Sequence, residues 1–218
     1  EAILDLDKPY YILFKNFTKQ LRTKIRNAEN NGIKIYKGNE EQLEYLYLHT
    51  QKKYPRNLEY FKTIYEEFAK TNNVEFFYAK LDTENYLKIT QEKYIKQEEI
   101  CADINNQVIN NIGNNNKLIS QKMEHDKLLE QYKKDLVLAT KLLREKPEGI
   151  VLASALLTRN NDEIYLIMDG YNPQYKKFNA KHLLLWKLCE RYSKSGFKKL
   201  NLGGIASITN TPTEYKGL

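Results

Sequence analysis

Three successive patterns of apolar residues follow one another in the last third of the chain. Continuous apolar runs at residues 150–157 and 164–168, with polar residues between them, predict a β-hairpin. Residues 180–193 then carry apolar side chains at helical spacing and are followed by a glycine, which predicts a helix. A third strand is predicted at residues 199–202. The order strand, strand, helix, strand is typical of an α/β or α+β core, and this core is predicted to organise the domain.

The first 81 residues alternate between strand and helix periods in the order β-α-β-α-α-β, which is typical of helices packed on a sheet. Strands are predicted at residues 2–6, 33–36 and 74–81, and helices at residues 12–30, 40–53 and 57–70. One face of the first helix has a row of cations at helical spacing, namely Lys15, Lys19, Arg22 and Arg26. This row suits either a solvated surface or a phosphate-binding stripe.

Residues 83–146 have a different composition, rich in Lys, Glu, Gln and Asn and poor in helix breakers. Apolar residues recur every seven positions in each half, at Leu87, Tyr94, Cys101 and Val108 and again at Leu129, Leu136 and Leu143. An asparagine-rich segment at residues 110–116 separates the halves. The pattern predicts an antiparallel two-helix coiled coil. Lys122 and His125 interrupt its seam, which favours an intramolecular arm over a dimer zipper.

The arm interrupts a single predicted domain. Residues 1–82 and 147–218 are predicted to form that domain, with residues 83–146 inserted as the arm. Because consecutive strands usually pair, the strand at residues 74–81 is expected to lie in the same sheet as the strand at residues 150–157.

The 218-residue chain has a formal net charge of +7 and a pI near 9.1, which favours an anionic partner such as nucleic acid, a phosphorylated substrate or a membrane surface. Its mean hydropathy is −0.69. No apolar run approaches the about 18 residues of a membrane span, and no signal-peptide pattern is present, so a cytoplasmic location is predicted. Cys101 and Cys189 lack metal-type spacing and are predicted to be reduced packing residues.

Motifs of the common nucleophilic, metal-dependent and nucleotide-binding enzymes are absent from the sequence, including the P-loop, GxSxG, HExxH, CxxC and Rossmann patterns. The glycine-rich loop that cradles the pyrophosphate of coenzyme A is missing too, which disfavours an ordinary CoA-dependent acyltransferase. Gly203 and Gly204 follow the last predicted strand and let a ligand approach the backbone, but this pair alone identifies no ligand.

Several segments, taken in order, resemble the second half of the Fem family (FemABX). These proteins are peptidoglycan-bridge aminoacyltransferases built of two acetyltransferase-like (GNAT) domains. Residues 19–34 (KQLRTKIRNAENNGIK) resemble the segment that opens the family's second domain. Some members also have a coiled-coil arm similar to the tRNA-binding arm of seryl-tRNA synthetase. The other matching segments are Met168-Asp169-Gly170, His182-Leu-Leu-Leu-Trp186-Lys, Gly196-Phe197 and Asn201-Leu-Gly-Gly204.

The resemblance implies a GNAT-like mixed sheet with flanking helices and no cofactor or metal. It implies transfer of an amino acid from aminoacyl-tRNA to the stem peptide of a lipid-linked or UDP-linked muramyl peptide, with peripheral association at the cytoplasmic face of the membrane. The implied residues are Lys216 and Asp169 for catalysis, Arg56, Tyr60, Tyr165, Gly203 and Gly204 for substrate binding, and Lys15, Lys19, Arg22, Arg26, Lys127, Lys133 and Lys134 for tRNA binding.

Three of these residues have alternative structural roles. Arg56 and, four residues later, Tyr60 fall where the family holds its muramyl peptide, but they also suit a surface cation and a packed helix face. Asp169 is expected to accept a proton or bind the acceptor amine, or else to be an ordinary turn residue. Activated esters react readily with amines, so positioning and oxyanion stabilisation can suffice without a catalytic triad.

The chain departs from the family pattern in two places. The 218 residues do not include a match to the first GNAT-like domain, so the chain is expected to be a fragment corresponding to the second half of a Fem-type protein. The sequence also stops near Lys216, where the family continues into a Phe-Lys segment thought to stabilise the oxyanion. We therefore expect the 218-residue chain alone to have little or no transferase activity. Two alternatives remain at this stage: a non-catalytic basic RNA-binding module with a coiled-coil arm, and a CoA-dependent small-molecule N-acyltransferase.

Overall fold

The computed structural model describes residues 2–51, 55–110 and 115–203. The chain divides into two compact units. The first, called the sheet unit, consists of Glu1–Leu81 and Val151–Leu218; the second, called the helical unit, is Asp82–Ile150.

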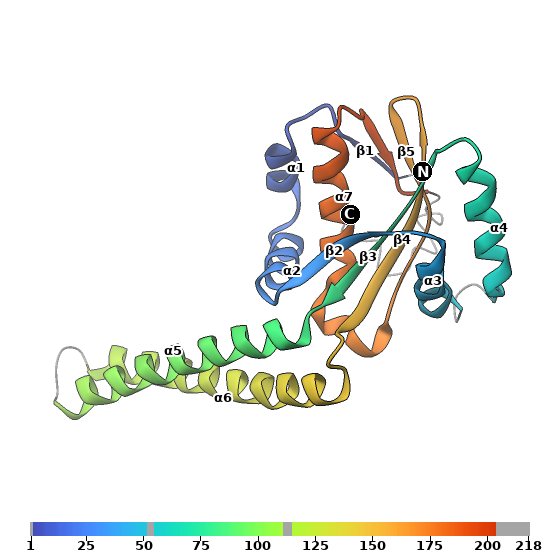
Figure 1. The fold of residues 1–218 in the computed structure, drawn as a ribbon. Coiled ribbons are helices and arrows are strands. Elements are labelled where there is room, and N and C mark those ends of the chain that lie inside the picture. Colours follow the sequence, from blue (N-terminus) through green and yellow to red (C-terminus); the bar gives the residue numbers. More distant parts are fainter. Residues whose placement is uncertain (1, 52–54, 111–114, 204–218) are drawn as a thin grey trace. The chain divides into compact units, whose positions relative to one another are not determined.

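The sheet unit is built on a six-stranded mixed sheet in the order β1-β6-β5-β4-β3-β2 (Figure 1). β5 and β6 pair in parallel, while β1 with β6, β2 with β3, and β4 with β5 are antiparallel. β3 and β4 are neighbours, which confirms the predicted pairing across the inserted residues. The strands are β1 (Ile3–Asp5), β2 (Ile33–Gly38), β3 (Val74–Leu81), β4 (Ile150–Asn160), β5 (Glu163–Tyr171) and β6 (Lys199–Asn201).

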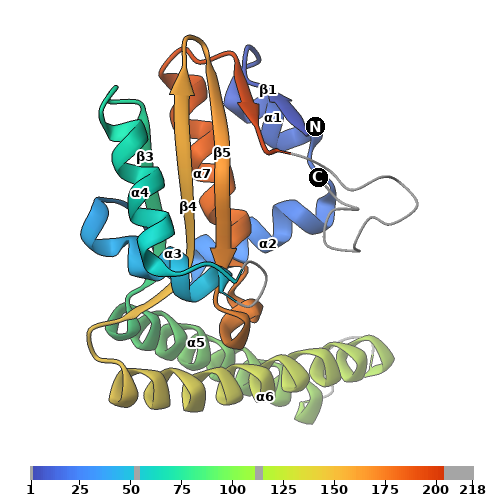
Figure 2. The ribbon, with the colours of Figure 1, turned by 90° about the vertical axis from the view of Figure 1, so that its right-hand side faces the viewer.

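Helices cover both faces of the sheet (Figures 1 and 2). The 3-10 turn η1 (Glu40–Gln42) leads into α3 (Leu43–Thr50), which packs with α4 (Leu58–Ala69) on one face. This face buries a cluster of side chains that are 0% exposed, and each contributes about 1.5–3 kcal/mol of hydrophobic stabilisation. The cluster comprises Leu43, Leu46, Phe61, Phe76 and Leu156. The other face is covered by α1 (Tyr10–Asn16), α2 (Lys19–Asn30) and α7 (Ala180–Lys194).

The predicted single helix at residues 12–30 is wrong, because the chain forms α1 and α2 with a break between them. Phe17 is extended, and the Thr18 side chain caps α2 by accepting a hydrogen bond from the Leu21 N–H at 3.2 Å. Arg22 donates to the Phe17 carbonyl at 3.0 Å and also to the Lys15 carbonyl, so its guanidinium satisfies the end of α1. The row of four cations is therefore divided between two helices, with Lys15 on α1.

The core predicted from the last third of the chain is confirmed. β4 and β5 form a hairpin that turns at Asn161, which has a left-handed φ of 49°. The 3-10 segment η2 (Pro173–Phe178) leads to α7, whose C-terminal end is followed by Gly196 with φ of 83°. Trp186 on α7 is 7% exposed, and its ring lies 4.9 Å from that of Phe14 on α1. The segment between β5 and β6 thus forms the helical connection that two parallel strands require.

The helical unit consists of α5 (Thr83–Ile109) and α6 (Asn115–Glu145), which run antiparallel. The Thr83 hydroxyl donates to the Lys146 carbonyl at 2.7 Å at one end, and Gln97 contacts His125 farther along. None of the helices in the described ranges has the length and apolar character needed to cross a bilayer.

The seam of the helical unit differs from the predicted heptad on α5. Leu87 and Tyr94 are only half-buried. The Gln97 amide donates to the His125 carbonyl at 3.1 Å and contacts its ring Nδ1 at 2.9 Å, so His125 is a satisfied seam residue. Cys101 is buried as predicted, but the first part of the seam uses Tyr86 instead of its apolar neighbour Leu87 and includes polar side chains. Its buried α5 residues are Thr83, Tyr86, Thr90, Gln97 and Cys101.

Candidate functional site

The carboxyl end of β5 places Asp169 against the first turn of α7. Asp169 Oδ2 lies 2.5 Å from Lys181 Nζ, and the two side chains are 17% and 26% exposed. Lys181 is the second residue of α7, which begins directly after Asn179 in a left-handed conformation with φ of 54°. This partly buried ion pair is a polar centre at the end of a strand, the usual place for ligand-binding groups in mixed α/β sheets. The sequence reasoning did not single out Lys181.

A β-bulge in β5 separates two residues that were predicted to act in one site. The register shifts between Leu156 and Leu157, so Ile167 lacks a partner in β4. Asp169 pairs with Ala155, whereas Tyr165 pairs with Thr158. Their partners Ala155 and Thr158 are three positions apart in β4, and side chains an odd number of positions apart in a strand point to opposite faces. Asp169 therefore faces α7, and Tyr165 faces the α3 side.

Tyr165 therefore does not join Asp169 in a common site. Its hydroxyl donates to Glu163 Oε2 at 2.8 Å, and its strand partner in β6 is Asn201. Asn201 in turn donates to Glu163 Oε1 at 3.3 Å. These bonds give Tyr165 a role in joining β5 to β6.

A histidine that sequence reasoning missed lies on the α3 side of the same strand end. His49 Nδ1 is 2.9 Å from the hydroxyl oxygen of Ser154, which is 0% exposed. Burial lowers the pKa of His49 to about 4, so its imidazole is neutral at pH 7. A Cβ added at Gly170 would lie 2.8 Å from His49 Cβ, which shows how closely α3 approaches β5.

Arg56 and Tyr60 are brought together at the start of α4. The Arg56 guanidinium carbon lies 5.3 Å from the centroid of the Tyr60 ring, a cation–π distance, and both side chains are exposed. Asn57 caps the helix by accepting a hydrogen bond from the Tyr60 N–H at 3.0 Å. The cap fixes the backbone, while the paired side chains remain available to a ligand.

Of the two predicted glycines, Gly203 lies within the described residues. Its φ of 87° requires glycine, and its N–H donates to Asn201 Oδ1 at 3.0 Å. Among residues 2–51, 55–110 and 115–203, the atom nearest to an added Cβ would be the Leu166 carbonyl oxygen at 3.9 Å. Gly204 and the predicted catalytic Lys216 lie outside the described residues.

The predicted tRNA-binding cations have different surroundings. Lys15 and Lys19 are exposed, Arg22 is half-buried against the end of α1, and the Arg26 guanidinium lies 5.4 Å from the Phe14 ring. The remaining three are exposed on α6 in the helical unit, and one of them forms an ion pair with Glu130 at 3.8 Å. These three are Lys127, Lys133 and Lys134, the last being the partner of Glu130.

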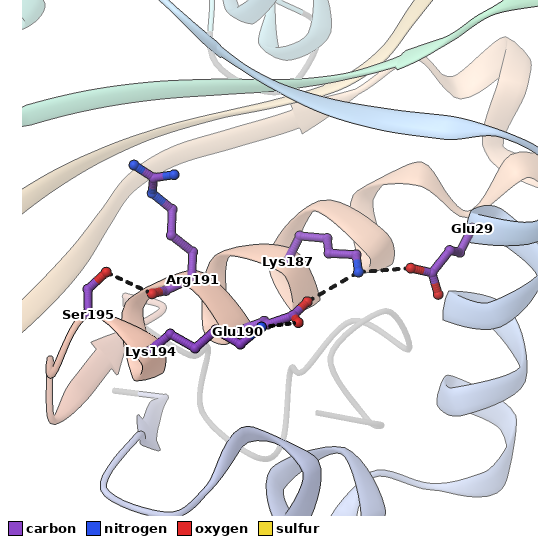
Figure 3. Close-up of polar contacts among 6 residues, drawn as sticks. All are labelled: Glu29, Lys187, Glu190, Arg191, Lys194 and Ser195. Atoms are coloured by element: carbon purple, nitrogen blue, oxygen red, sulfur yellow. Dashed lines mark hydrogen bonds and ion pairs between the residues drawn. The ribbon is translucent and has the colours of Figure 1, made fainter.

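An ion-pair network joins α7 to α2 (Figure 3). Lys187 Nζ lies 2.8 Å from Glu29 of α2 and 3.1 Å from Glu190 of α7, and Glu190 also pairs with Lys194 at 2.8 Å. Burial opposes the charge on Lys187, but the hydrogen bonds that its ammonium donates to the Glu29 and Glu190 carboxylates outweigh burial and raise the pKa of Lys187. Within residues 2–51, 55–110 and 115–203, no three His, Cys, Asp or Glu side chains gather where they could hold a metal ion.

The sheet with helices on both faces has the fold of the crystal structure of FemX. The two structures superimpose with a TM-score of 0.73 at 19% sequence identity, covering 99% of this chain and 55% of that one. The model of the FemAB family matches residues 2–218. This chain therefore belongs to the FemAB family, as the sequence resemblance predicted.

Curated relatives of known name match over nearly the whole chain. The lipid II:glycine glycyltransferase of Staphylococcus haemolyticus (strain JCSC1435) is 25% identical over 224 residues, covering 99% of this chain and 52% of that protein. The protein of the same name from Staphylococcus aureus is 24% identical over 232 residues, covering 99% and 53%. The chain thus spans about half the length of the curated relatives it matches.

Proposed function

We propose that this chain serves in the transfer of an amino acid from an aminoacyl-tRNA to an amine on the stem peptide of a peptidoglycan precursor. The observation that carries the proposal is the match to the FemAB family over residues 2–218, together with relatives named lipid II:glycine glycyltransferase. Glycine is accordingly the first donor amino acid to test, and lipid II the first acceptor. The reaction takes place at the cytoplasmic face of the membrane, with which the protein associates peripherally.

The proposed reaction is the aminolysis of an ester. The neutral acceptor amine attacks the carbonyl carbon of the aminoacyl ester, a C–N bond forms, and the C–O bond to the tRNA ribose breaks. The amine loses one proton, and the departing ribose oxygen gains one, so the reaction needs no oxidant or reductant. Because the ester is already activated, correct positioning of the amine and stabilisation of the oxyanion supply most of the catalysis.

Asp169 is the described residue best placed to bind the acceptor amine. Its carboxylate already holds an ammonium group, that of Lys181, at 2.5 Å in a partly buried position. An acceptor ammonium can take the same place and leave its proton with the carboxylate before attack. Arg56 and Tyr60 offer an exposed cation and ring for a carboxylate or phosphate of the precursor.

In the same proposal, the two units bind different substrates. The sheet unit is the GNAT-like domain that holds the acceptor, and the helical unit is an inserted arm that contacts the tRNA. The exposed lysines of α6 suit that role, since phosphate contacts dominate sequence-independent binding to nucleic acid.

The test is a transfer assay with radiolabelled glycyl-tRNA and lipid II, run both with the 218-residue chain and with the product of the complete open reading frame that encodes it. We expect labelled lipid II from the complete product, little from the 218-residue chain, and none after ribonuclease treatment of the donor. Transfer from glycine or acetyl groups on coenzyme A, with no transfer from charged tRNA, would overturn the proposal.

The role of Asp169 is tested in the active protein with a matched control. Asp169→Asn should lower kcat/KM by about 10- to 100-fold, because it removes the charge that holds the amine. Asp162→Asn should leave kcat/KM unchanged, since Asp162 forms an ion pair with Lys198 in the exposed hairpin turn, at 3.1 Å with both side chains more than half exposed. Equal changes of kcat/KM for the two substitutions would show that Asp169 does not bind the acceptor amine.

A further inference from the structure

Two tyrosines form an exposed stacked pair at the edge of the sheet unit. Tyr36 on β2 lies directly opposite Tyr78 on β3, and their ring centroids are 5.5 Å apart with an interplanar angle of 20°. β2 is the last strand at this edge of the sheet (Figure 1). Tyr36 is 39% exposed, so one ring of the stack is open to solvent. We call Tyr36 and Tyr78 the tyrosine platform.

The neighbouring residues hold the platform rigid. The Tyr45 ring of α3 meets Tyr78 edge-on, with centroids 5.3 Å apart. Gly38 leaves room for the rings, because a Cβ there would lie 2.7 Å from Cδ1 of Phe76 and 3.2 Å from Cε1 of Tyr78. Phe76 is fully buried, so the platform rests on the hydrophobic core. An aromatic surface fixed in this way loses little conformational entropy when a flat ligand stacks on it.

A pair of lysines lies next to the platform on the same face of the sheet. Lys34 and Lys80 are direct partners in the β2–β3 ladder, two residues before Tyr36 and two after Tyr78, or about 7 Å along the strands. Lys34 is exposed and Lys80 half-buried, and neither forms an ion pair among the described residues. Like charges directly opposite each other destabilise a sheet, so this pair does not serve the fold itself. An anionic ligand would relieve the repulsion.

We propose that the tyrosine platform and the Lys34–Lys80 pair bind unpaired nucleotides of an RNA strand. A base stacks on Tyr36, and the two ammonium groups hold a neighbouring phosphate. Stacking rings combined with cations along a strand are the general means by which proteins hold single-stranded nucleic acid. Because the interaction uses the face of a base and a phosphate, it requires no particular sequence. The inference rests on the proposed function in that a tRNA donor would supply the unpaired nucleotides.

The experiment measures binding of a fluorescein-labelled oligoadenylate of about eight nucleotides to the 218-residue chain by fluorescence anisotropy, over a series of salt concentrations. Tyr36→Ala should weaken binding about tenfold, whereas Tyr36→Phe should bind like the wild type because it keeps the ring. Replacing both Lys34 and Lys80 by Gln should weaken binding and flatten the slope of log affinity against log salt by about 1.

Matched control residues lie at the opposite edge of the sheet and on α1. Lys8→Gln with Lys199→Gln removes two charges at that edge, and Tyr11→Ala removes a tyrosine that is 55% exposed on α1. Both should bind the oligonucleotide like the wild type, and thermal unfolding confirms that each variant is folded. Equal weakening by the control and platform variants, or full binding by Tyr36→Ala, would overturn the proposal.

Further outcomes distinguish this inference from a single-nucleotide site and from the proposed function. Competition by free uridine diphosphate as strong as that by the oligonucleotide would overturn the assignment to an RNA strand and indicate a single-nucleotide site. Normal glycyl transfer by a Tyr36→Ala protein that also binds the oligonucleotide normally would refute the inference while leaving the proposed function intact. Failure of transfer from every donor, with oligonucleotide binding as expected, would instead refute the proposed function alone.

Discussion

Glu75 is a buried carboxylate that joins the sheet to α7, and its removal should destabilise the sheet unit measurably. The side chain is 5% exposed, accepts a hydrogen bond from the Tyr192 hydroxyl at 2.6 Å and pairs with Lys37 Nζ at 2.8 Å. Tyr192 is 2% exposed, whereas the Lys37 side chain is 55% exposed. The two partners therefore respond differently when the carboxylate is lost.

The expected magnitude follows from those exposures. In Glu75→Ala the Tyr192 hydroxyl stays buried without its acceptor, which costs about 1–3 kcal/mol, while Lys37 turns to water at little cost. The cavity left by the side chain adds to this, so we expect a loss of about 3 kcal/mol in the free energy of unfolding. Glu75→Gln keeps the volume and an acceptor for Tyr192, and should cost about 1 kcal/mol.

The pH dependence identifies the charge as the cause. Burial favours the neutral acid, but the hydrogen bonds from Lys37 and Tyr192 outweigh burial and lower the pKa of Glu75 from its ordinary value of 4.5. Since the folded-state pKa lies below that of the unfolded chain, the stabilisation is complete above about pH 4.5 and is lost as the pH falls through the folded pKa. The difference between wild type and Glu75→Gln should therefore shrink on acidification.

The assay is urea unfolding followed by fluorescence of the single tryptophan, Trp186, which lies on α7 in the sheet unit. Glu67→Gln serves as the control. Glu67 is 61% exposed and pairs with the exposed Lys70 at the end of α4, so the free energy of unfolding should change by less than about 0.5 kcal/mol. Equal losses for Glu75→Ala and Glu75→Gln at pH 7, or a Glu75→Gln difference that stays constant down to about pH 3, would refute the reasoning.

Three other changes test other parts of the molecule. Gly170→Ala should lower the free energy of unfolding by about 1–3 kcal/mol, because its Cβ would lie 2.8 Å from His49 Cβ; unchanged stability would contradict that close approach. Arg56→Ala in the active protein should mainly raise the KM for lipid II, as expected for lost ground-state binding, and an effect on kcat alone would point elsewhere. Charge reversal at three α6 lysines should weaken tRNA binding several-fold and flatten its salt slope by about 2 with an unchanged circular dichroism spectrum, and identical slopes would exclude the arm from tRNA contact. The three substitutions are Lys127→Glu, Lys133→Glu and Lys134→Glu.

The sequence alone determined the family and, apart from the break between α1 and α2, the order of the elements. Local features set the β4–β5 hairpin, the α7 helix before Gly196 and the pair of long helices, because periodicity and turn chemistry act over a few residues. The neighbouring positions of β3 and β4 also followed, since strands that are consecutive in the sequence usually pair. The family resemblance rested on the order of short segments along the chain, and this order can be read from the sequence without knowing the fold.

The tertiary structure decided how the candidate site is assembled. The bulge at Ile167 turns Tyr165 and Asp169 to opposite faces, although they are four positions apart and a regular strand would place them on one face. The Asp169–Lys181 pair and the partner of His49 depend on how α7 and α3 dock, which no local pattern encodes. On α5, two adjacent apolar residues left the seam undetermined by one position until packing against α6 selected Tyr86. Local periodicity therefore fixed which elements form, whereas strand register and long-range packing fixed which side chains meet.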